Sequence, residues 1–393
     1  MNILITSNDP YPQYMGGDKR VAISLAKEWT QCGHNAFFLC YSPSLLRKSE
    51  VDGIEQLFFP DNNHLFSDRN LSFFRKTIME RKVQIVLHQH PKVPEFNRMC
   101  FSLNTSAKLV SVVHFDIAHE EKVLARSFFV KMRNGRNIKR WVIDGFLYVK
   151  YLLFAKRKQY NELVRLYTDI YDHSDCVALL SSSYIDSFIN YVPYATKRKL
   201  LSLNNPMKSI NYLPTIPKEK IVLWVGRLGY DMKRLDYMLK IWMEINKSHP
   251  DWKLKILGSG DWNYWKRIIA QYHIKNADVV GFCNPTEYYA KASILFMTSV
   301  TEGWGMVLVE AQQYGCVPMA YRSYAALDDI IVDGENGYSV KAFDQNDYVN
   351  KLRRLMDDVD LRRRMAMRGI ESVKRFDVDK IAATWIAHFE SIL

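Results

Sequence analysis

The sequence lacks the patterns that mark several common protein classes. Its six cysteines are scattered and include no Cys-x-x-Cys pair, so we expect buried, reduced thiols of a cytosolic protein, not a disulfide framework or a zinc site. No uncharged apolar stretch reaches the ~18–20 residues that a membrane span needs. The N-terminal residues enter a strand-like run directly, without a basic leader or cleavage site, and we expect no secretory signal.

Two common nucleotide motifs are also missing. Residues 258–260 read Gly-Ser-Gly, but the third glycine of a dinucleotide fingerprint does not follow, and there is no Gly-x-x-x-x-Gly-Lys phosphate loop. The Asp-x-Asp pairs at 358–360 and 377–379 lie far from any strand end, so helix caps and solvated faces explain them better than a divalent ion does. The histidines do not stand at zinc-motif spacing either: His88, His90, His114 and His119. We therefore expect no metal.

Size and charge set the remaining limits. The chain has 393 residues, 48% of them hydrophobic, which is enough for two domains of roughly 200 residues each. Its formal net charge of +12 favours anionic partners such as nucleotides or an anionic membrane. No nucleic-acid readout motif accompanies that charge, so we expect no nucleic acid partner.

Strand-like and helix-like segments alternate twice along the chain. The strands expected in the first half are 2–6, 35–41, 84–87, 108–113 and 176–181, with helical stretches such as 18–31 between them. The strands expected in the second half are 221–225, 253–257, 277–280, 294–298 and 317–321. This alternation predicts an α/β protein with two parallel sheets, each covered by helices on both faces.

The domain boundaries follow from this alternation and from a run of prolines. We expect an N-terminal, acceptor-side Rossmann-like domain over 1–205, with a helical insertion at about 120–170, and a linker over 206–218. A C-terminal donor domain would cover 219–375, and a helix over 376–393 would return to the first domain. Ligands of open parallel sheets bind beyond the carboxyl ends of the strands, so the chemistry is sought there.

The most informative segment runs from Glu302 to Glu310. It follows a predicted buried strand and leads into a predicted helix over 306–314 that Gly315 ends. Gly303 and Gly305 would let backbone N–H groups approach a phosphate at the positive end of that helix. The two carboxylates repel phosphate but accept hydrogen bonds from hydroxyls, as on a sugar. The segment thus suggests a nucleotide-sugar site; the alternative is a helix with an acidic first turn and no ligand.

Two cations follow the first strand of the second half. Arg227 stands at the end of that strand and Lys233 at the start of the next helix. A guanidinium fork and a compact ammonium could together neutralise a diphosphate leaving group. The alternative is a pair of solvated loop cations.

The first half carries weaker candidates. Gly16 and Gly17 precede a helix and could lie close to a phosphate or sugar; the alternative is a flexible loop in which Asp18 is the N-cap. His114 ends a strand-like run and could bond a hydroxyl or the reacting phosphate, or else be an ordinary structural histidine.

Taken together, these segments resemble the retaining nucleotide-sugar glycosyltransferases of family 4, which share the GT-B fold of two Rossmann-like domains facing across a cleft. The resemblance covers nearly the whole chain. The residues that carry it are Gly16-Gly17, Ala22 through Gly33-His34, His114 with Asp116, Gly226-Arg227 with Lys233, Glu302 and Glu310 at E-x7-E spacing, Gly315-Cys316-Val317-Pro318, and Asp333-Gly334-Glu335-Asn336-Gly337.

The resemblance implies roles for residues on both sides of the site. Arg227 and Lys233 would hold the donor diphosphate, Glu310 the ribose hydroxyls and Glu302 the donor sugar, while His114 would contact the transferred sugar. The remaining implied donor contacts are Gly16, Gly17, Phe282, Cys283, Gly303, Trp304, Gly305, Met306 and Val307. Trp304 stands where phenylalanine is common in the family. Family members are generally metal-independent, and the nucleotide sugar is a co-substrate, so no cofactor is expected.

The residues from 120 to 170 predict a basic, aromatic helical insertion. A short apolar stretch flanked by Arg140 and by Lys156-Arg157-Lys158 is what an interfacial helix needs, and it would suit a lipid-linked acceptor. The alternative is a helical hairpin that covers the first sheet while its cations stay in water.

The sequence as a whole predicts a retaining hexosyltransferase. It would move a sugar from a nucleoside diphosphate, uridine being preferred to guanosine, to a saccharide or lipid-linked saccharide in polysaccharide, capsule or lipopolysaccharide assembly. We expect a cytoplasmic protein, with peripheral binding at the inner membrane face as an option. The alternatives are a nucleotide-sugar epimerase of similar fold and a catalytically silent sugar-binding module.

Overall fold

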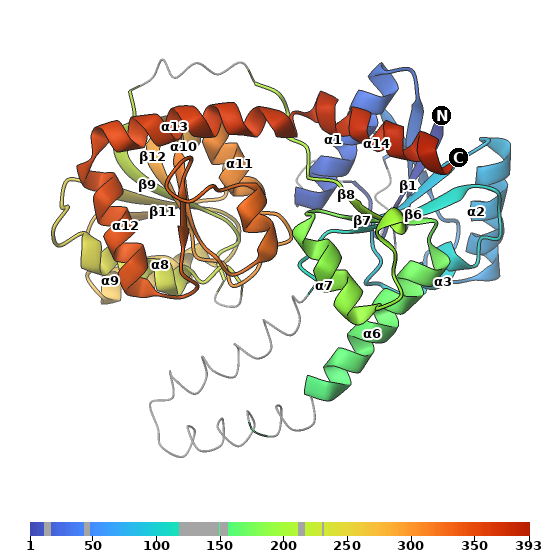
Figure 1. Cartoon of the computed structure of the whole chain (residues 1–393), viewed down its shortest axis with the longest axis horizontal. Helices are drawn as coiled ribbons and strands as arrows, with labels where there is room; N and C mark the ends of the chain where they lie inside the picture. Colours follow the sequence, from blue (N-terminus) through green and yellow to red (C-terminus); the bar gives the residue numbers. More distant parts are fainter. Residues whose placement is uncertain (12–16, 43–47, 118–148, 150–155, 211–216, 230–231) are drawn as a thin grey trace. The chain divides into compact units, whose positions relative to one another are not determined.

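The computed structural model describes residues 1–11, 17–42, 48–117, 149, 156–210, 217–229 and 232–393. These residues form two compact units (Figure 1). Unit 1 contains the described residues of Met1–Ile117, Lys156–Lys208 and Phe376–Leu393, and unit 2 those of Ala118–Ala155 and Ser209–Arg375. Part of the predicted linker, 211–216, and most of the predicted insertion, 120–148 and 150–155, lie outside the described residues.

Unit 1 is built on an eight-stranded sheet of order β3-β4-β2-β1-β5-β6-β7-β8, parallel except for the β3–β4 pair. Its strands are β1 (Asn2–Ser7), β2 (Asn35–Cys40), β3 (Glu50–Val51), β4 (Ile54–Phe58), β5 (Ile85–His88), β6 (Lys108–Val113), β7 (Cys176–Leu179) and β8 (Leu200–Ser202). Its described helices are α1 (Gly17–Gln31), α2 (Asp68–Glu80), α3 (Pro94–Phe101), α6 (Lys156–His173), α7 (Ser183–Tyr191), η2 (Lys197–Lys199) and α14 (Val378–Ile392).

Unit 2 contains a six-stranded, wholly parallel sheet of order β11-β10-β9-β12-β13-β14. Its strands are β9 (Glu219–Val225), β10 (Lys253–Leu257), β11 (Ala277–Gly281), β12 (Ala292–Met297), β13 (Val317–Tyr321) and β14 (Tyr338–Val340). Its described helices are α8 (Leu235–Ile245), α9 (Trp262–Gln271), α10 (Thr286–Lys291), α11 (Met306–Gln313), η3 (Ala325–Asp329), α12 (Gln345–Asp357), α13 (Val359–Val373) and η4 (Lys374–Phe376).

The ten strands predicted from apolar runs are all present, with shifts of one or two residues at their ends. They are strands that helices bury on both faces, so they appear in the sequence as continuous apolar segments. Every residue of β12 is buried, for example. Four strands, β3, β4, β8 and β14, were not predicted; three of them, β3, β8 and β14, have only two or three residues, which give too little pattern.

The C-terminal helix α14 packs on α1 inside unit 1, where the two lie side by side (Figure 1). Trp29 of α1 is 1% exposed, and its indole N–H donates to the carbonyl of Ala382 at 3.2 Å. Its ring also meets Trp385 and Phe389 of α14 edge-on, with centroids 6.2 and 5.6 Å away. These aromatic contacts hold the end of the chain against the first helix.

The structure tests two predictions about helix caps. Asp358 caps α13 by accepting the N–H of Leu361, as predicted for that aspartate pair. Helix α1 begins at Gly17, so Asp18 lies in its first turn and is not the N-cap considered above.

All six cysteines are free, and four are buried, but the exposed Cys32 and Cys283 depart from the expectation of buried thiols. Within the described part of the chain, no helix is long and apolar enough to cross a membrane.

His88 ends β5 with no exposed surface. Its Nε2 lies 2.7 Å from Oδ1 of Asn97, while Nδ1 has no hydrogen-bond partner among the described residues. The neutral ring with its proton on Nε2 satisfies this arrangement, because an amide oxygen only accepts. Burial lowers the pKa of His88 to about 4, since the charged imidazolium would lose its hydration.

This buried histidine makes stability depend on pH. The folded pKa of about 4 lies below the ordinary histidine value of 6.5, so the unfolded chain binds the proton more readily. The free energy of unfolding should therefore fall as pH drops from about 6.5 to about 4, with His88 contributing about 3 kcal/mol of the loss. Urea unfolding of the wild type and His88→Leu across this range tests it. The variant should show the shallower slope, and equal slopes would contradict the assignment.

Candidate functional site

The candidate residues of unit 2 lie at the carboxyl edge of its sheet. The chain runs from β9 outward to β10 and β11, then returns to the other side of β9 to form β12. The strand order therefore reverses between β9 and β12, and at such a point the loops diverge and leave room for a ligand. Arg227 and Lys233 follow β9, and Glu302 through Val307 follow β12. The sequence places both groups of predicted residues at this reversal.

The loops after β9 and β10 touch through glycine. A Cβ on Gly258, whose φ is +148°, would lie 1.6 Å from the carbonyl oxygen of Gly226, so only glycine fits there. The N–H of Leu228 donates to the carbonyl of Ser259 at 2.8 Å. Arg227, between these fixed residues, is exposed and has no ion-pair partner among the described residues. Its guanidinium is available to a ligand at this edge.

Lys233 forms an ion pair with Glu302. The ammonium donates to Oε1 of the carboxylate, and the two side chains are only 23% and 13% exposed. Partial burial weakens screening by water, so the pair is held more firmly than one on an open surface. The roles predicted for these residues were separate, Lys233 toward phosphate and Glu302 toward sugar. In the structure they are direct partners.

The backbone around Lys233 is tied to the loop that follows β12. The hydroxyl of Thr298 lies 3.0 Å from the carbonyl oxygens of both Lys233 and Arg234. The N–H of Val300 donates to the carbonyl of Met232 at 2.7 Å. These bonds fix the start of α8 against the end of β12 and so position both members of the Lys233–Glu302 pair.

Helix α11 begins at a glycine in the left-handed region. Gly305 is its N-cap, with φ of +101°, and a Cβ there would lie 2.6 Å from the hydroxyl oxygen of Tyr324. No side chain caps the helix. The first N–H groups of a helix, here those of Met306 and Val307, have no intrahelical acceptor. Together with the helix dipole they form a position suited to an anion, beside the Lys233–Glu302 loop. Trp304, just before the glycine, is 2% exposed and serves the core.

Glu310 lies one turn further along α11 and is only 8% exposed. Its Oε2 accepts a hydrogen bond of 2.8 Å from the hydroxyl of Tyr289, which belongs to α10. Tyr289 is itself 2% exposed, and its ring stacks on Tyr314 with centroids 6.2 Å apart. A buried carboxylate is costly without such donors. Tyr289 therefore fixes the orientation of Glu310, a function that the sequence gave no signal for.

An exposed aromatic pair lies beyond β10 and β11. Phe282 is 58% exposed and follows the strand, and Cys283 is exposed next to it. Trp262, the first residue of α9, is 41% exposed and donates its indole N–H to the carbonyl of Gly258 at 3.1 Å. A Cβ on Gly281 would meet the Trp262 ring at 3.4 Å. The ring of Trp262 thus offers a further flat face at this edge of the sheet. The sequence indicates this role only by the position of an aromatic residue just after Gly-x-Gly.

Unit 1 carries its own group of candidates at the carboxyl ends of β1, β5 and β6. His114 bonds Gln89 through Nε2, while its Nδ1 is buried and has no partner among the described residues. Burial lowers the pKa of His114 to about 4, which the charge of Asp18 opposes and that of His90 reinforces. Gly17 starts α1 beside this group, whereas Gly16 lies outside the described residues. Gln89 was not singled out from the sequence.

The predicted residues thus form two sets, one in each unit. Unit 2 brings together Lys233 and Glu302 directly, with Arg227, Gly303 to Val307 and Glu310 on the neighbouring loops and helix. Unit 1 holds His114 and Gly17. Among the described residues, no group of three or more His, Cys, Asp or Glu side chains could hold a metal ion.

With this geometry in view, the chain was compared with known proteins. Residues 209–372 match the family model described as glycosyl transferases group 1. The matched range contains Arg227, Lys233, Glu302 and Glu310. The match falls within unit 2 and covers less than half of the chain, so it shows that unit 2 is similar to this family.

Two curated relatives extend this finding. An uncharacterized glycosyltransferase of Haemophilus influenzae is 28% identical over 193 residues, which are 46% of this chain and 54% of the relative. The "GalNAc-alpha-(1->4)-GalNAc-alpha-(1->3)-diNAcBac-PP-undecaprenol alpha-1,4-N-acetyl-D-galactosaminyltransferase" of Campylobacter jejuni is 24% identical over 224 residues, 55% of this chain and 60% of that protein. The chain spans little more than half the length of these relatives.

Solved structures establish the fold. The Anabaena protein Alr3699/HepE, solved in complex with UDP, superimposes with a TM-score of 0.71 at 15% identity, covering 100% of both chains. At that identity the likeness concerns the fold alone. The predicted GT-B class, an α/β protein with two parallel-sheet units, is confirmed.

The Tyr289–Glu310 contact can be tested by its contribution to stability. Tyr289→Phe keeps the ring but removes the donor to a buried carboxylate, which should lower the free energy of unfolding by about 1.5–3 kcal/mol. Urea unfolding at neutral pH measures the change. Tyr288→Phe, the neighbouring tyrosine of α10, is the matched control and should change stability by less than about 0.5 kcal/mol. Equal effects of the two substitutions would remove the role given to Tyr289.

Proposed function

We propose that the protein transfers a sugar from a nucleoside diphosphate sugar to a saccharide acceptor. The observation that carries this proposal is the Lys233–Glu302 ion pair beside the glycine-initiated end of α11, at the strand-order reversal of a unit that matches the group 1 glycosyl transferases. A cation, a carboxylate and free helix N–H groups there suit a ligand that has both phosphate and hydroxyl groups.

The cations and the helix end would bind the diphosphate. Negative charge develops on the leaving phosphate oxygen as the bond from the sugar's anomeric carbon breaks. The exposed guanidinium of Arg227, the ammonium of Lys233 and the N–H groups at Met306 and Val307 would all stabilise that charge. Lys233 is already held by its ion pair and by the bond from Thr298 to its carbonyl, so little backbone reorganisation is needed when the donor binds.

The carboxylates would accept hydrogen bonds from hydroxyl groups of the donor. In the free chain Glu302 neutralises Lys233; with donor bound, phosphate would take over part of the ammonium's charge, and Glu302 would accept hydrogen bonds from hydroxyls of the sugar. Glu310, oriented by Tyr289, would accept those of the ribose. Phe282, Cys283 and Trp262, which follow β11 and β10, would flank the base.

The finer details belong to the same proposal. HepE of the same fold was solved with UDP, and we propose UDP as the nucleotide. We also propose a hexose donor, transfer with retention and no requirement for a metal. The acceptor oxygen would then form its bond to the anomeric carbon on the face that the phosphate leaves, and its proton would pass to the departing phosphate oxygen. His114, with Gly17, is our candidate contact to the transferred sugar.

Substitution of the two cations tests the core of this proposal. Arg227→Ala and Lys233→Ala should each lower the rate of acceptor-dependent nucleotide release by about 100-fold or more, the scale of losing one charge-stabilising donor. Arg227→Ala is the easier variant to interpret, because Arg227 is exposed and its substitution breaks no ion pair among the described residues.

The matched control is Lys240→Ala, which removes an exposed cation from α8 of the same unit. It should leave the rate unchanged. The assay uses a panel of UDP sugars with saccharide acceptors and measures UDP release. Wild-type rates in both Arg227→Ala and Lys233→Ala would overturn the assigned roles, and turnover of the donor to an isomer without acceptor would favour an epimerase.

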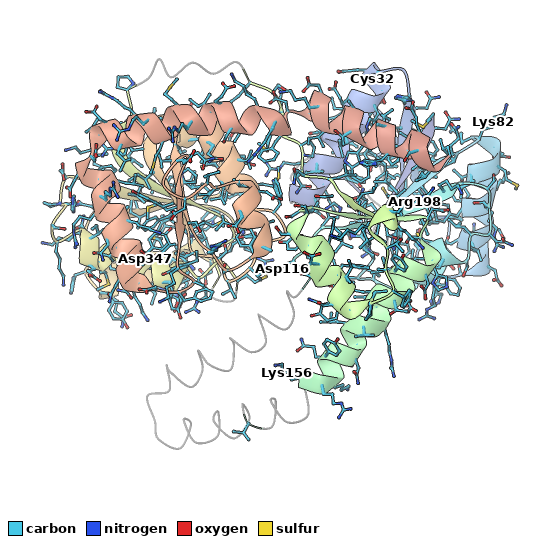
Figure 2. The ribbon with its side chains drawn as sticks, viewed as in Figure 1. Cys32, Lys82, Asp116, Lys156, Arg198 and Asp347 are labelled. Atoms are coloured by element: carbon cyan, nitrogen blue, oxygen red, sulfur yellow. The ribbon has the colours of Figure 1, made fainter. Side chains whose placement is uncertain are left out.

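We further propose that the acceptor is linked to a lipid and that the protein binds an anionic membrane surface at the cytoplasmic face. The Campylobacter relative carries PP-undecaprenol in its name. In this chain, Lys156, Arg157 and Lys158 are exposed at the start of α6, and Lys156 lies at the end of that helix that extends away from the sheet of unit 1 (Figure 2). Lysine and arginine near an anionic surface each contribute about 1 kcal/mol.

Vesicle sedimentation measures this binding. The wild type should pellet with phosphatidylglycerol vesicles, and replacement of Lys156, Arg157 and Lys158 by glutamate should abolish pelleting, because the charge reversal turns attraction into repulsion. The control replaces Arg353, Arg354 and Arg364, cations of α12 and α13, by glutamate. Equal loss in the control would assign the effect to net charge, and a wild type that stays in solution would reject the proposal.

A further inference from the structure

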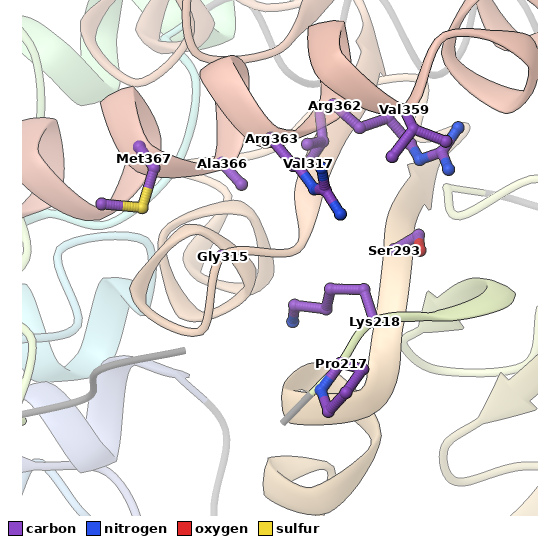
Figure 3. Close-up of a pocket in the computed structure, with 10 residues that line it drawn as sticks. All are labelled: Pro217, Lys218, Ser293, Gly315, Val317, Val359, Arg362, Arg363, Ala366 and Met367. Atoms are coloured by element: carbon purple, nitrogen blue, oxygen red, sulfur yellow. The ribbon is translucent and has the colours of Figure 1, made fainter. Parts of the chain in front are cut away.

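Unit 2 contains a pocket at the amino edge of its sheet, the edge opposite to the candidate site. It has a volume of about 520 Å³. Its floor comes from the starts of β9, β12 and β13, and its other wall from α13 (Figure 3). The described residues that line it are Pro217, Lys218, Ser293, Gly315, Val317, Val359, Arg362, Arg363, Ala366 and Met367. None of the residues assigned to the donor is among them.

The charge of this lining has one sign. Lys218, Arg362 and Arg363 contribute three cations, and no aspartate or glutamate is among the described lining residues. Figure 3 shows Lys218 facing the side chains of α13 across the pocket. A concave surface whose charged lining residues are all cations attracts an anion.

Lys218 is the most constrained of the three cations. Its ammonium donates to the carbonyl oxygens of Tyr289 and Tyr314 at 2.8 and 2.6 Å. Burial lowers its pKa, but carbonyls are neutral and leave its charge uncompensated. An ammonium has three N–H donors, so one remains after these two bonds. This third N–H can donate to a ligand in the pocket while both hydrogen bonds to the carbonyls remain.

The arginines add directional donors. Arg362 is held by backbone carbonyls at the end of α12, Leu355 and Met356, which use its Nη1 only. Arg363 meets Asp360 at 3.5 Å, but both side chains are 77% exposed, so this pair contributes little. Guanidinium forks match the geometry of phosphate oxygens better than single point charges do.

Apolar side chains complete the lining. Pro217, Val317 and Ala366 form part of the wall, and Val359 and Met367, which are 46% and 57% exposed, lie at the pocket on α13. A purely inorganic anion would leave these groups in contact with water. A ligand that carries an apolar group as well as its charge would cover them.

We propose that this pocket binds a small phosphate ester with an apolar substituent. The phosphate contacts Lys218, Arg362 and Arg363, and the substituent lies against the valines, Ala366 and Met367. The site does not depend on the function proposed above, because its residues and the donor residues lie at opposite edges of the sheet.

The test uses n-hexyl phosphate as the probe and isothermal titration calorimetry on the full chain. One molecule should bind per chain. Inorganic phosphate should bind at least about tenfold more weakly, and hexanol should not bind. Arg363→Gln should weaken hexyl phosphate binding at least about tenfold, the loss of one charged hydrogen bond, and Ala366→Phe should block the pocket.

Two control variants decide where the probe sits. Arg364→Gln removes the adjacent exposed cation of α13, which does not line the pocket, and should leave affinity unchanged. Arg227→Ala should also leave it unchanged, even if the function proposed above is wrong. Absence of saturable binding would overturn the site, as would equal affinity in the wild type, Arg363→Gln and Ala366→Phe. A loss confined to Arg227→Ala would place the probe at the donor edge and overturn it too.

Vesicles that contain phosphatidic acid separate the two sources of such an ester. If these vesicles displace hexyl phosphate from the wild type, the pocket, whose affinity depends on Arg363, binds a lipid headgroup. If they do not, the site takes a free ester. Either outcome agrees with the proposed chemistry.

Discussion

Strand β9 hydrogen-bonds to β10 on one side and to β12 on the other, and the arrangement of unit 2 depends on this central position. All three strands are parallel, so their carboxyl ends meet at one edge, and the loops that leave them start within a few ångströms of each other. Gly258 permits the closest of these approaches, because a Cβ there would collide with the backbone of Gly226. Residues as distant in sequence as Lys233 and Glu302 thereby become partners.

The ion pair between Lys233 and Glu302 also lowers the cost of partial burial at this edge of the sheet. A cation and a carboxylate here each lose part of their hydration. Paired with each other, they offset part of that cost. The same reasoning applies to Glu310, whose buried carboxylate has the hydroxyl of Tyr289 as a donor.

The sequence predicted the fold well where burial leaves a clear pattern. Runs such as 221–225 and 294–298 appear as strands because both faces of each strand are covered, and the glycine at 305 marks the start of α11 as expected. Short edge strands such as β14 escaped prediction, since three residues show no period. The candidate residues at the ends of β9 and β12 were found because their place in the order of elements fixes the edge at which they lie.

Contacts between side chains were beyond prediction. Nothing in the sequence shows that Lys233 reaches Glu302 or that Tyr289 reaches Glu310, because these pairs depend on side-chain rotamers and on how helices pack. Trp262 was not singled out from the sequence, whereas its ring lies against Gly281 at the candidate site. The roles of the individual donor residues remain predictions.

The ammonium of Lys218 donates to the carbonyl of Tyr289 in α10 and to that of Tyr314, which follows α11. It thereby connects α10 to the end of α11. Tyr289 also donates its hydroxyl to Glu310, so Lys218 helps to hold the tyrosine that orients this buried carboxylate. Substitution of Lys218 would remove that support.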